Sequence, residues 1–77
     1  MSIIPMLRSR EVIGVLLKVG FKVVRQSGSH VRLRHILNPA RQTTIPIHNP
    51  DIPRSILLKI LKQASISIKE FLGLLKK

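Results

Sequence analysis

The sequence of 77 residues contains no cysteine, no tryptophan and no tyrosine, and it has few acidic residues. The absence of cysteine excludes a disulfide framework, a cysteine-based zinc site and a thiol nucleophile. Uninterrupted apolar runs cover only a handful of residues, far short of the roughly 18 that a membrane-spanning helix needs. The apolar stretch over residues 1–6 is too short for a secretory signal and lacks a cleavage site. We therefore expect a cytoplasmic protein that does not enter a membrane.

The scarcity of aromatic residues limits how nucleic acid could be bound. Phe21 and Phe71 are the only residues of the Phe, Trp and Tyr class, and both fit a hydrophobic core. A platform on which single-stranded bases stack is therefore not expected. Recognition of a structured nucleic acid through its backbone and shape remains open.

Acidic residues are so few that positive charge dominates the sequence. The 14 lysine and arginine residues against three acidic ones give a formal net charge of +11. This balance favours a polyanionic partner, which is nucleic acid, an acidic protein or an anionic membrane surface. The basic residues are spread from Arg8 to Lys77, so any single one of them can also be an ordinary solvated side chain.

Length and hydrophobic content predict one folded domain over residues 1–77. Hydrophobic residues make up 44% of the chain, which is too many for a disordered protein. The core is marginal, because a chain of this length buries only about 60% of its unfolded surface. Small domains without disulfides or metals often rely on a partner or on self-association, so weak self-association stays open.

A helix is predicted over residues 9–19, because valine and leucine recur along one face at helical spacing. Ser9 is the expected N-cap, and Glu11 suits the positive end of the helix dipole. Gly20 follows directly, as a C-terminal glycine should.

Three strands are predicted over residues 21–26, 30–37 and 42–48, where apolar and polar side chains alternate. A glycine turn at residues 27–29 joins the first two strands into a hairpin. Pro46 has no N–H, so the third strand should lie at a sheet edge or contain a bulge. Alternation in the first strand puts three side chains on one face: Phe21, Val23 and Arg25. Alternation in the second strand likewise groups His30, Arg32 and Arg34.

Two further helices are predicted after the proline-rich break at residues 49–53. The second helix begins near Pro53 and carries an apolar stripe made of Ile56, Leu57, Ile60, Leu61 and Ala64. A capping box of Ser67 and Glu70, with Ile66 and Phe71 spaced as a hydrophobic staple, predicts a third helix over residues 68–75. The order α-β-β-β-α-α predicts an α+β fold, in which helices cover one face of a three-stranded antiparallel sheet.

His30 is the strongest candidate for a catalytic group. It follows the glycine turn and shares a strand face with Arg32 and Arg34. Imidazole can take a proton from a ribose 2′-hydroxyl near neutral pH, while arginine stabilises charge that develops on the phosphate. From spacing alone, His30 can also be a polar strand residue within a basic patch.

The other two histidines have simpler explanations. His35 faces the apolar side of the second strand, where a buried or strand-end histidine is expected. His48 ends the third strand and either contacts a phosphate backbone or completes the strand. The spacing of the three histidines fits no zinc finger or ribbon, so neither a metal nor another cofactor is expected.

Several short motifs follow one another in order along most of the chain. Gly20-Phe21, Arg25 and Gly28-Ser29-His30 come first, and Ile45-Pro46-Ile47-His48 comes later. The segment from Ser55 to Phe71 closes the series. In this order and spacing, the motifs resemble the HicA toxin family over nearly the whole chain.

The resemblance implies a fold like that of double-stranded-RNA-binding domains. It also implies the toxin of a bacterial toxin–antitoxin pair, an endoribonuclease that cleaves mRNA, with an acidic HicB-like antitoxin as its partner. The family's essential histidine corresponds to His30, and we expect catalysis without metal. The candidate RNA- and phosphate-binding residues are Arg25, Ser29, Arg32, Arg34 and His48.

Two other function classes stay open at this point. A non-catalytic module that binds structured RNA would have the same fold and basic patch, with His30 serving only as a contact. A basic membrane-active peptide would share the amphipathic helices, but the strands and turns do not suit a helix that lies on a membrane surface.

Overall fold

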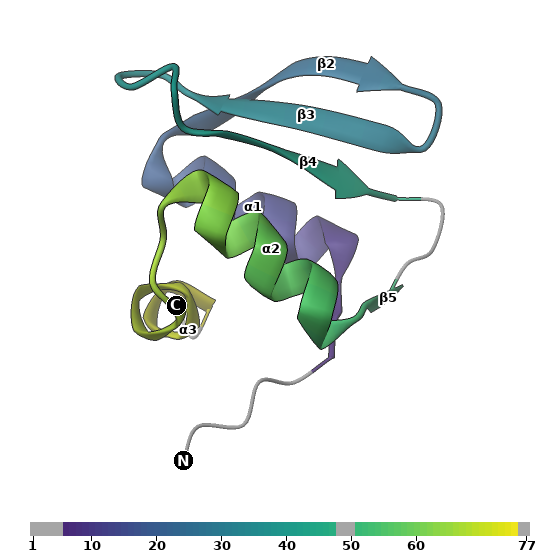
Figure 1. Ribbon diagram of the computed structural model, residues 1–77, viewed down its shortest axis with the longest axis vertical. Helices are drawn as coiled ribbons and strands as arrows, with labels where there is room; N and C mark the ends of the chain where they lie inside the picture. Colours follow the sequence, from purple (N-terminus) through teal and green to yellow (C-terminus); the bar gives the residue numbers. More distant parts are fainter. Residues whose placement is uncertain (1–5, 48–50, 76–77) are drawn as a thin grey trace.

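The computed structural model describes residues 6–47 and 51–75 and shows a sheet with helices on one of its faces (Figure 1). The elements in chain order are β1 (Leu7–Arg8), α1 (Ser9–Val19), β2 (Phe21–Ser27), β3 (His30–His35), β4 (Gln42–Pro46), β5 (Asp51–Ile52), α2 (Arg54–Ala64) and α3 (Ile68–Leu75). Strands β2, β3 and β4 form an antiparallel sheet in that order. Helices α1 and α2 lie against one face, and α3 packs on both helices. The expected α+β class and element order are confirmed.

Buried apolar side chains fill the space between the sheet and the helices. Val31, Leu33 and Ile45 point from β3 and β4 into this layer, and both phenylalanines are buried as expected. Each fully buried side chain of this kind contributes about 1.5–3 kcal/mol. Helices α1 and α2 bury the positions Val12, Val15, Leu16, Leu57, Ile60, Leu61 and Ala64.

The start of α1 differs from the sequence prediction. Arg8 occupies the N-cap position, and Ser9 is the first helical residue and is buried. The Arg8 N–H donates to the Glu11 carboxylate at 2.9 Å. The helix start is set by β1, which pairs Leu7 with Ile52 and so holds the preceding backbone extended.

The β1–β5 pair was not predicted, because two-residue strands are too short to show an alternation of apolar and polar residues. Arg8 pairs with Asp51, beside the buried pair of Leu7 and Ile52. The pair joins the starts of α1 and α2, since each helix begins within two residues of it. It replaces the simple chain break that was expected at residues 51 and 52.

A β-bulge in β2 changes which face Arg25 occupies. The ladder shifts register between Val23 and Arg25, so Arg25 pairs with Arg32. Strict alternation would have kept Arg25 with Phe21 and Val23 on the helix-covered face. That prediction is wrong, because the extra residue, Val24, reverses the side-chain direction beyond it.

The hairpin between β2 and β3 has a two-residue turn, Gly28–Ser29, closed by the pair Ser27 and His30. Gly28 has a φ of 57°, and the following Ser29 has no positive φ. A positive φ at the first central position alone is the pattern of a type II′ turn, which favours glycine there. The turn therefore fixes His30 as the first residue of β3.

Two of the predicted strands end earlier than expected. β3 ends at His35, and Ile36 and Leu37 are exposed beyond it. β4 ends at Pro46, and His48, the expected end of this strand, lies outside the described residues. Pro46 does lie on an edge strand, as its missing N–H predicts.

Candidate functional site

One face of the sheet is left open by the helices (Figure 1). The strand register places three rows of side chains on this face. Residues paired across an antiparallel ladder point to the same face, so the register defines each row. The rows are Ser27–His30–Pro46, Arg25–Arg32–Thr44 and Lys22–Arg34–Gln42.

Like charges lie directly opposite each other in two of these rows. Arg25 pairs with Arg32, and Lys22 pairs with Arg34. Directly opposed like charges destabilise a sheet. An anion placed between such a pair would relieve this repulsion, so the arrangement favours binding of a polyanion.

Within the part of the chain that the structure describes, strands β2, β3 and β4 carry no acidic residue to offset the positive charge of the open face. The three acidic residues of the chain lie elsewhere, with Glu11 at the start of α1, Asp51 in β5 and Glu70 in α3. The open face therefore has a positive potential, which attracts anions from a distance.

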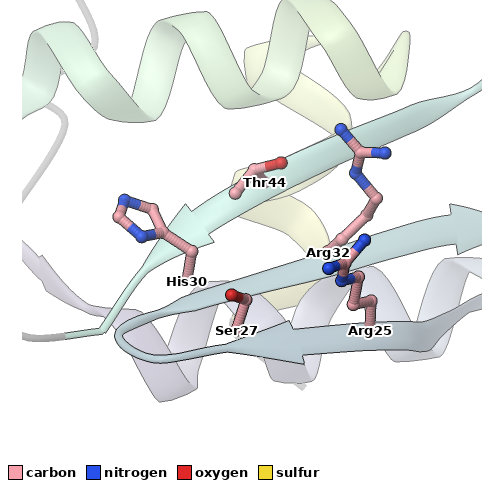
Figure 2. Close-up of a pocket in the computed structure, with 5 residues that line it drawn as sticks. All are labelled: Arg25, Ser27, His30, Arg32 and Thr44. Atoms are coloured by element: carbon pink, nitrogen blue, oxygen red, sulfur yellow. The ribbon is translucent and has the colours of Figure 1, made fainter.

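An open hollow of about 210 Å³ lies on this face, and we refer to it as the His30 hollow. Its lining residues are Arg25, Ser27, His30, Arg32 and Thr44. Figure 2 shows the guanidinium groups of Arg25 and Arg32 at one end and the imidazole of His30 at the other. A phosphodiester in the hollow would therefore meet a proton-transfer group at one end and two cations at the other.

The structure brings together three of the predicted site residues, which are Arg25, His30 and Arg32. Arg34 lies on the same face one row further along and does not line the hollow. Its Nε atom is buried, and within the described part of the chain it has no hydrogen-bond partner. Ser29 lies in the turn, where its carbonyl accepts the Ile47 N–H at 2.6 Å. His48 lies outside the described residues.

Two lining residues were not among the sequence candidates. Ser27 enters the hollow because it closes the two-residue turn opposite His30. Thr44 enters because it pairs with Arg32. The sequence could have indicated Thr44, because alternation along β4 puts this residue on the face opposite to the buried Thr43 and Ile45.

His35 lies at the other end of β3 and faces the helices. Its Nδ1 atom accepts the N–H groups of Leu37 at 3.1 Å and Asn38 at 3.2 Å. The proton therefore resides on Nε2, which donates to the Val19 carbonyl at 3.1 Å. The imidazole also packs edge-on against Phe21, with ring centroids 5.2 Å apart. The predicted structural role of His35 is confirmed.

Gly20 allows this close packing of His35. It has a φ of 111° at the C-cap of α1, a conformation that other residues rarely adopt. A Cβ atom at this position would lie 3.1 Å from His35 Nε2. The expected C-terminal glycine is confirmed.

Within residues 6–47 and 51–75, no group of three or more His, Cys, Asp or Glu side chains could hold a metal ion. None of the helices in these ranges is long and apolar enough to cross a membrane.

The structure is that of a small α+β protein whose open sheet face carries His30 and two arginines in one hollow, an arrangement that favours an anionic ligand. The family model described as HicA toxin of bacterial toxin-antitoxin matches residues 9–66, which is most of the chain. The chain therefore belongs to the HicA toxin family, and membership of a toxin–antitoxin family implies an antitoxin partner. A comparison with curated protein sequences finds none that matches this chain.

Proposed function

We propose that this toxin is an endoribonuclease that cleaves mRNA, with His30 as its catalytic residue. The observation that carries the proposal is the His30 hollow, which an exposed imidazole shares with Arg25 and Arg32 on a sheet whose described strands carry no acidic residue. Membership of the HicA toxin family supports the same activity.

The cleavage step uses the ribose of the RNA itself as the nucleophile. His30 takes the proton of a 2′-hydroxyl, and the 2′-oxygen attacks the adjacent phosphorus. The bond from phosphorus to the 5′-oxygen breaks, the 5′-oxygen takes up a proton from water, and the upstream fragment keeps a 2′,3′-cyclic phosphate. Arg25 and Arg32 stabilise the negative charge that accumulates on the phosphoryl oxygens.

The remaining candidate residues would extend the contact beyond the cleaved phosphate. Arg34 follows Arg32 on the same strand face and would contact a neighbouring phosphate. Ser29 and His48 are proposed as further contacts of the RNA backbone. A polyanion bound in this way is held mainly by charge, because both phenylalanines are buried in the core.

With a single proton-transfer group, the site predicts a slow enzyme. General acid–base catalysis by one positioned group contributes about 10²- to 10⁴-fold. Slow turnover suits a toxin, since a long transcript is inactivated by a single cut. We accordingly propose that the toxin acts in the cytoplasm, where mRNA is found.

The chemistry is tested with a short RNA and its copy carrying a single 2′-deoxy nucleotide at the cut. The purified toxin should cleave the RNA, leave a 2′,3′-cyclic phosphate and spare the deoxy copy. Cleavage should continue in excess chelator, because the mechanism uses no metal. Cleavage of the deoxy copy, or its loss with chelator, would contradict the mechanism.

We further propose that the antitoxin is an acidic HicB-like protein that covers the open face. Carboxylates are attracted by the same arginines that attract phosphates, so the charge that recruits RNA also speeds association with an acidic partner. Covering His30 while competing for Arg32 and Arg34 would stop cleavage directly.

Hydrogen exchange distinguishes this arrangement from indirect inhibition. Addition of the antitoxin should stop RNA cleavage and slow amide exchange across residues 30–34. Inhibition with protection confined to α2 and α3 would place the antitoxin on the helix side and contradict the proposal.

A further inference from the structure

A second hollow adjoins the His30 hollow at the exposed edge of β4, and we refer to it as the edge hollow. It has a volume of about 350 Å³ and is lined by Arg32, Ala40, Gln42, Thr43, Thr44 and Gln63. Arg32 and Thr44 line both hollows, so the two form one continuous surface. A strand of RNA whose phosphate occupies the His30 hollow therefore has a neighbouring nucleotide within reach of the edge hollow.

The chemistry of the edge hollow differs from that of the His30 hollow. Arg32 is its only charged lining residue, and the others present amides, hydroxyls and a methyl group. Phosphates are bound chiefly by cations, whereas bases are distinguished by hydrogen bonds to their edges. The lining therefore suits a base.

A hydrogen bond from β4 positions the side chain of Gln63. The hydroxyl of Thr43, a residue only 3% exposed, donates to Gln63 Oε1 at 2.7 Å. With its carbonyl engaged in this way, the amide offers its NH₂ group as a donor. Arg41 Nε donates to the Ala64 carbonyl at 2.8 Å, which ties the end of α2 to the start of β4.

The backbone of Thr44 adds a second recognition group. Arg41 and Ile47 make their backbone hydrogen bonds to the β3 side, so the alternating pattern turns Thr44 outward. Its N–H and C=O are thus presented at the sheet edge, as an adjacent donor and acceptor. At the next outward position, Pro46 has no N–H to offer.

Arg32 provides the stacking group that the aromatic residues do not. Phe21 and Phe71 are both buried, whereas Arg32 is exposed on the open face between the two hollows. A guanidinium plane can stack on a base in the way that an aromatic ring does. The same side chain would contact the phosphate on its other side.

We propose that the edge hollow binds the base of a nucleotide next to the cleaved phosphodiester, and that Gln63 makes the site selective. The proposal rests on the proposed endoribonuclease function. Gln63 donates to an acceptor on the base, Thr43 positions Gln63, and the Thr44 backbone pairs with the base edge. The toxin therefore prefers certain bases at one fixed position beside the cut.

The test maps cut positions in a randomised RNA pool for the toxin and for Gln63→Ala, Thr43→Val and Gln26→Ala. Losing one hydrogen bond should reduce the base preference at the flanking position about five-fold in Gln63→Ala, and by less in Thr43→Val. Gln26→Ala is the matched control, because Gln26 is an exposed glutamine on β2 that lines neither hollow. It should keep the preference.

Each outcome separates the two proposals. Cleavage without any base preference, or with the same preference in Gln63→Ala, overturns the edge hollow as a base site and leaves the nuclease intact. Absence of cleavage overturns the nuclease. In that case, affinities for short RNAs of single base composition test the hollow, and it fails if Gln63→Ala leaves their ratios unchanged.

Discussion

Strand β3 carries a histidine at each end, and the two side chains lie on opposite faces of the sheet. His30 is exposed on the open face, in a hollow with Arg25 and Arg32. His35 is 9% exposed, and both of its ring nitrogens make hydrogen bonds to backbone groups. An odd separation of five residues turns the side chains in opposite directions, so one strand supplies both a chemical group and a structural one.

The two faces differ in the same way as the two histidines. The helix-covered face is mostly apolar, and its two buried polar side chains, His35 and Thr43, both make hydrogen bonds. The open face holds two pairs of opposed like charges, Arg25 with Arg32 and Lys22 with Arg34. Such pairs oppose sheet formation, so the packed face must supply the stability that the open face gives up.

Replacement of His30 should have the largest effect on activity and little effect on folding. His30→Ala should reduce RNA cleavage by at least about 10²-fold, because the mechanism has one proton-transfer group. The free energy of unfolding should change by less than about 0.5 kcal/mol, as is usual for an exposed position. Single-turnover cleavage and thermal unfolding measure the two effects.

The control for that experiment is RNA affinity. His30→Ala should still bind RNA, because Arg25 and Arg32 remain in place. Cleavage at the original rate would remove His30 from the mechanism, and absence of cleavage by both proteins would favour the non-catalytic RNA-binding module. Loss of folding would show that His30 has a structural role.

Replacement of His35 should show the opposite pattern. His35→Ala leaves the N–H groups of Leu37 and Asn38 and the Val19 carbonyl without their partner and opens a cavity against Phe21. The expected loss is about 2–4 kcal/mol in the free energy of unfolding. Urea denaturation in a His30→Ala background measures it without toxicity.

His35→Asn serves as the second variant, in case His35→Ala does not fold. The asparagine oxygen can accept the N–H groups that Nδ1 accepts, so this variant should retain part of the lost stability. Equal stability of the native protein and both variants would contradict the structural role of His35.

The salt dependence of RNA binding should distinguish the charges of the two faces. If about five phosphates are neutralised, the log–log slope of affinity against salt should be near −4. Arg25→Ala should bring this slope about 1 closer to zero. Arg54→Ala removes the same charge at the start of α2 and should leave it unchanged. A flat salt dependence, or equal effects of both variants, would contradict binding at the open face.

The sequence predicts the packed face better than the open one. Apolar periodicity locates the long helices and the strands. The Ser67 half of the predicted capping box is confirmed, because the Glu70 N–H donates to Ser67 Oγ at 3.0 Å. Ile66 and Phe71 beside it are both buried. These features depend on local chemistry and burial, which recur at fixed spacing along the chain.

The errors arise where pairing between distant segments decides the structure. The bulge at Val24 moves Arg25 to the open face, and only the β2–β3 register reveals it. The β1–β5 pair moves the N-cap of α1 from Ser9 to Arg8. The sequence does not reveal this pair, because two-residue strands are too short to show an alternation of apolar and polar residues. Alternation separates Thr44 from the buried Thr43 and Ile45, but only the pairing of β4 with β3 places Thr44 opposite Arg32 in the candidate site.

The smallest expected effect concerns Ser65, the residue that ends α2. Ser65 is exposed and has a φ of 59°, which makes it the only non-glycine residue with a positive φ in the described ranges. A side chain in this left-handed conformation costs about 1–2 kcal/mol, and glycine avoids this cost while losing more entropy on folding. Ser65→Gly should therefore stabilise the protein by about 0.5–1 kcal/mol.

The Ser65 experiment sharpens the contrast between the two faces, because it changes stability on the helix side alone. The Ser65 N–H bonds to the Leu61 and Lys62 carbonyls, and glycine keeps both contacts. Thermal unfolding should show a rise of a few degrees for Ser65→Gly, since about 1 kcal/mol shifts a domain of this size by roughly 4–8 °C. Ser65→Ala keeps the Cβ atom and should show no such rise. RNA cleavage should be the same in all three proteins, and equal melting temperatures for the glycine and alanine variants would contradict the strain argument.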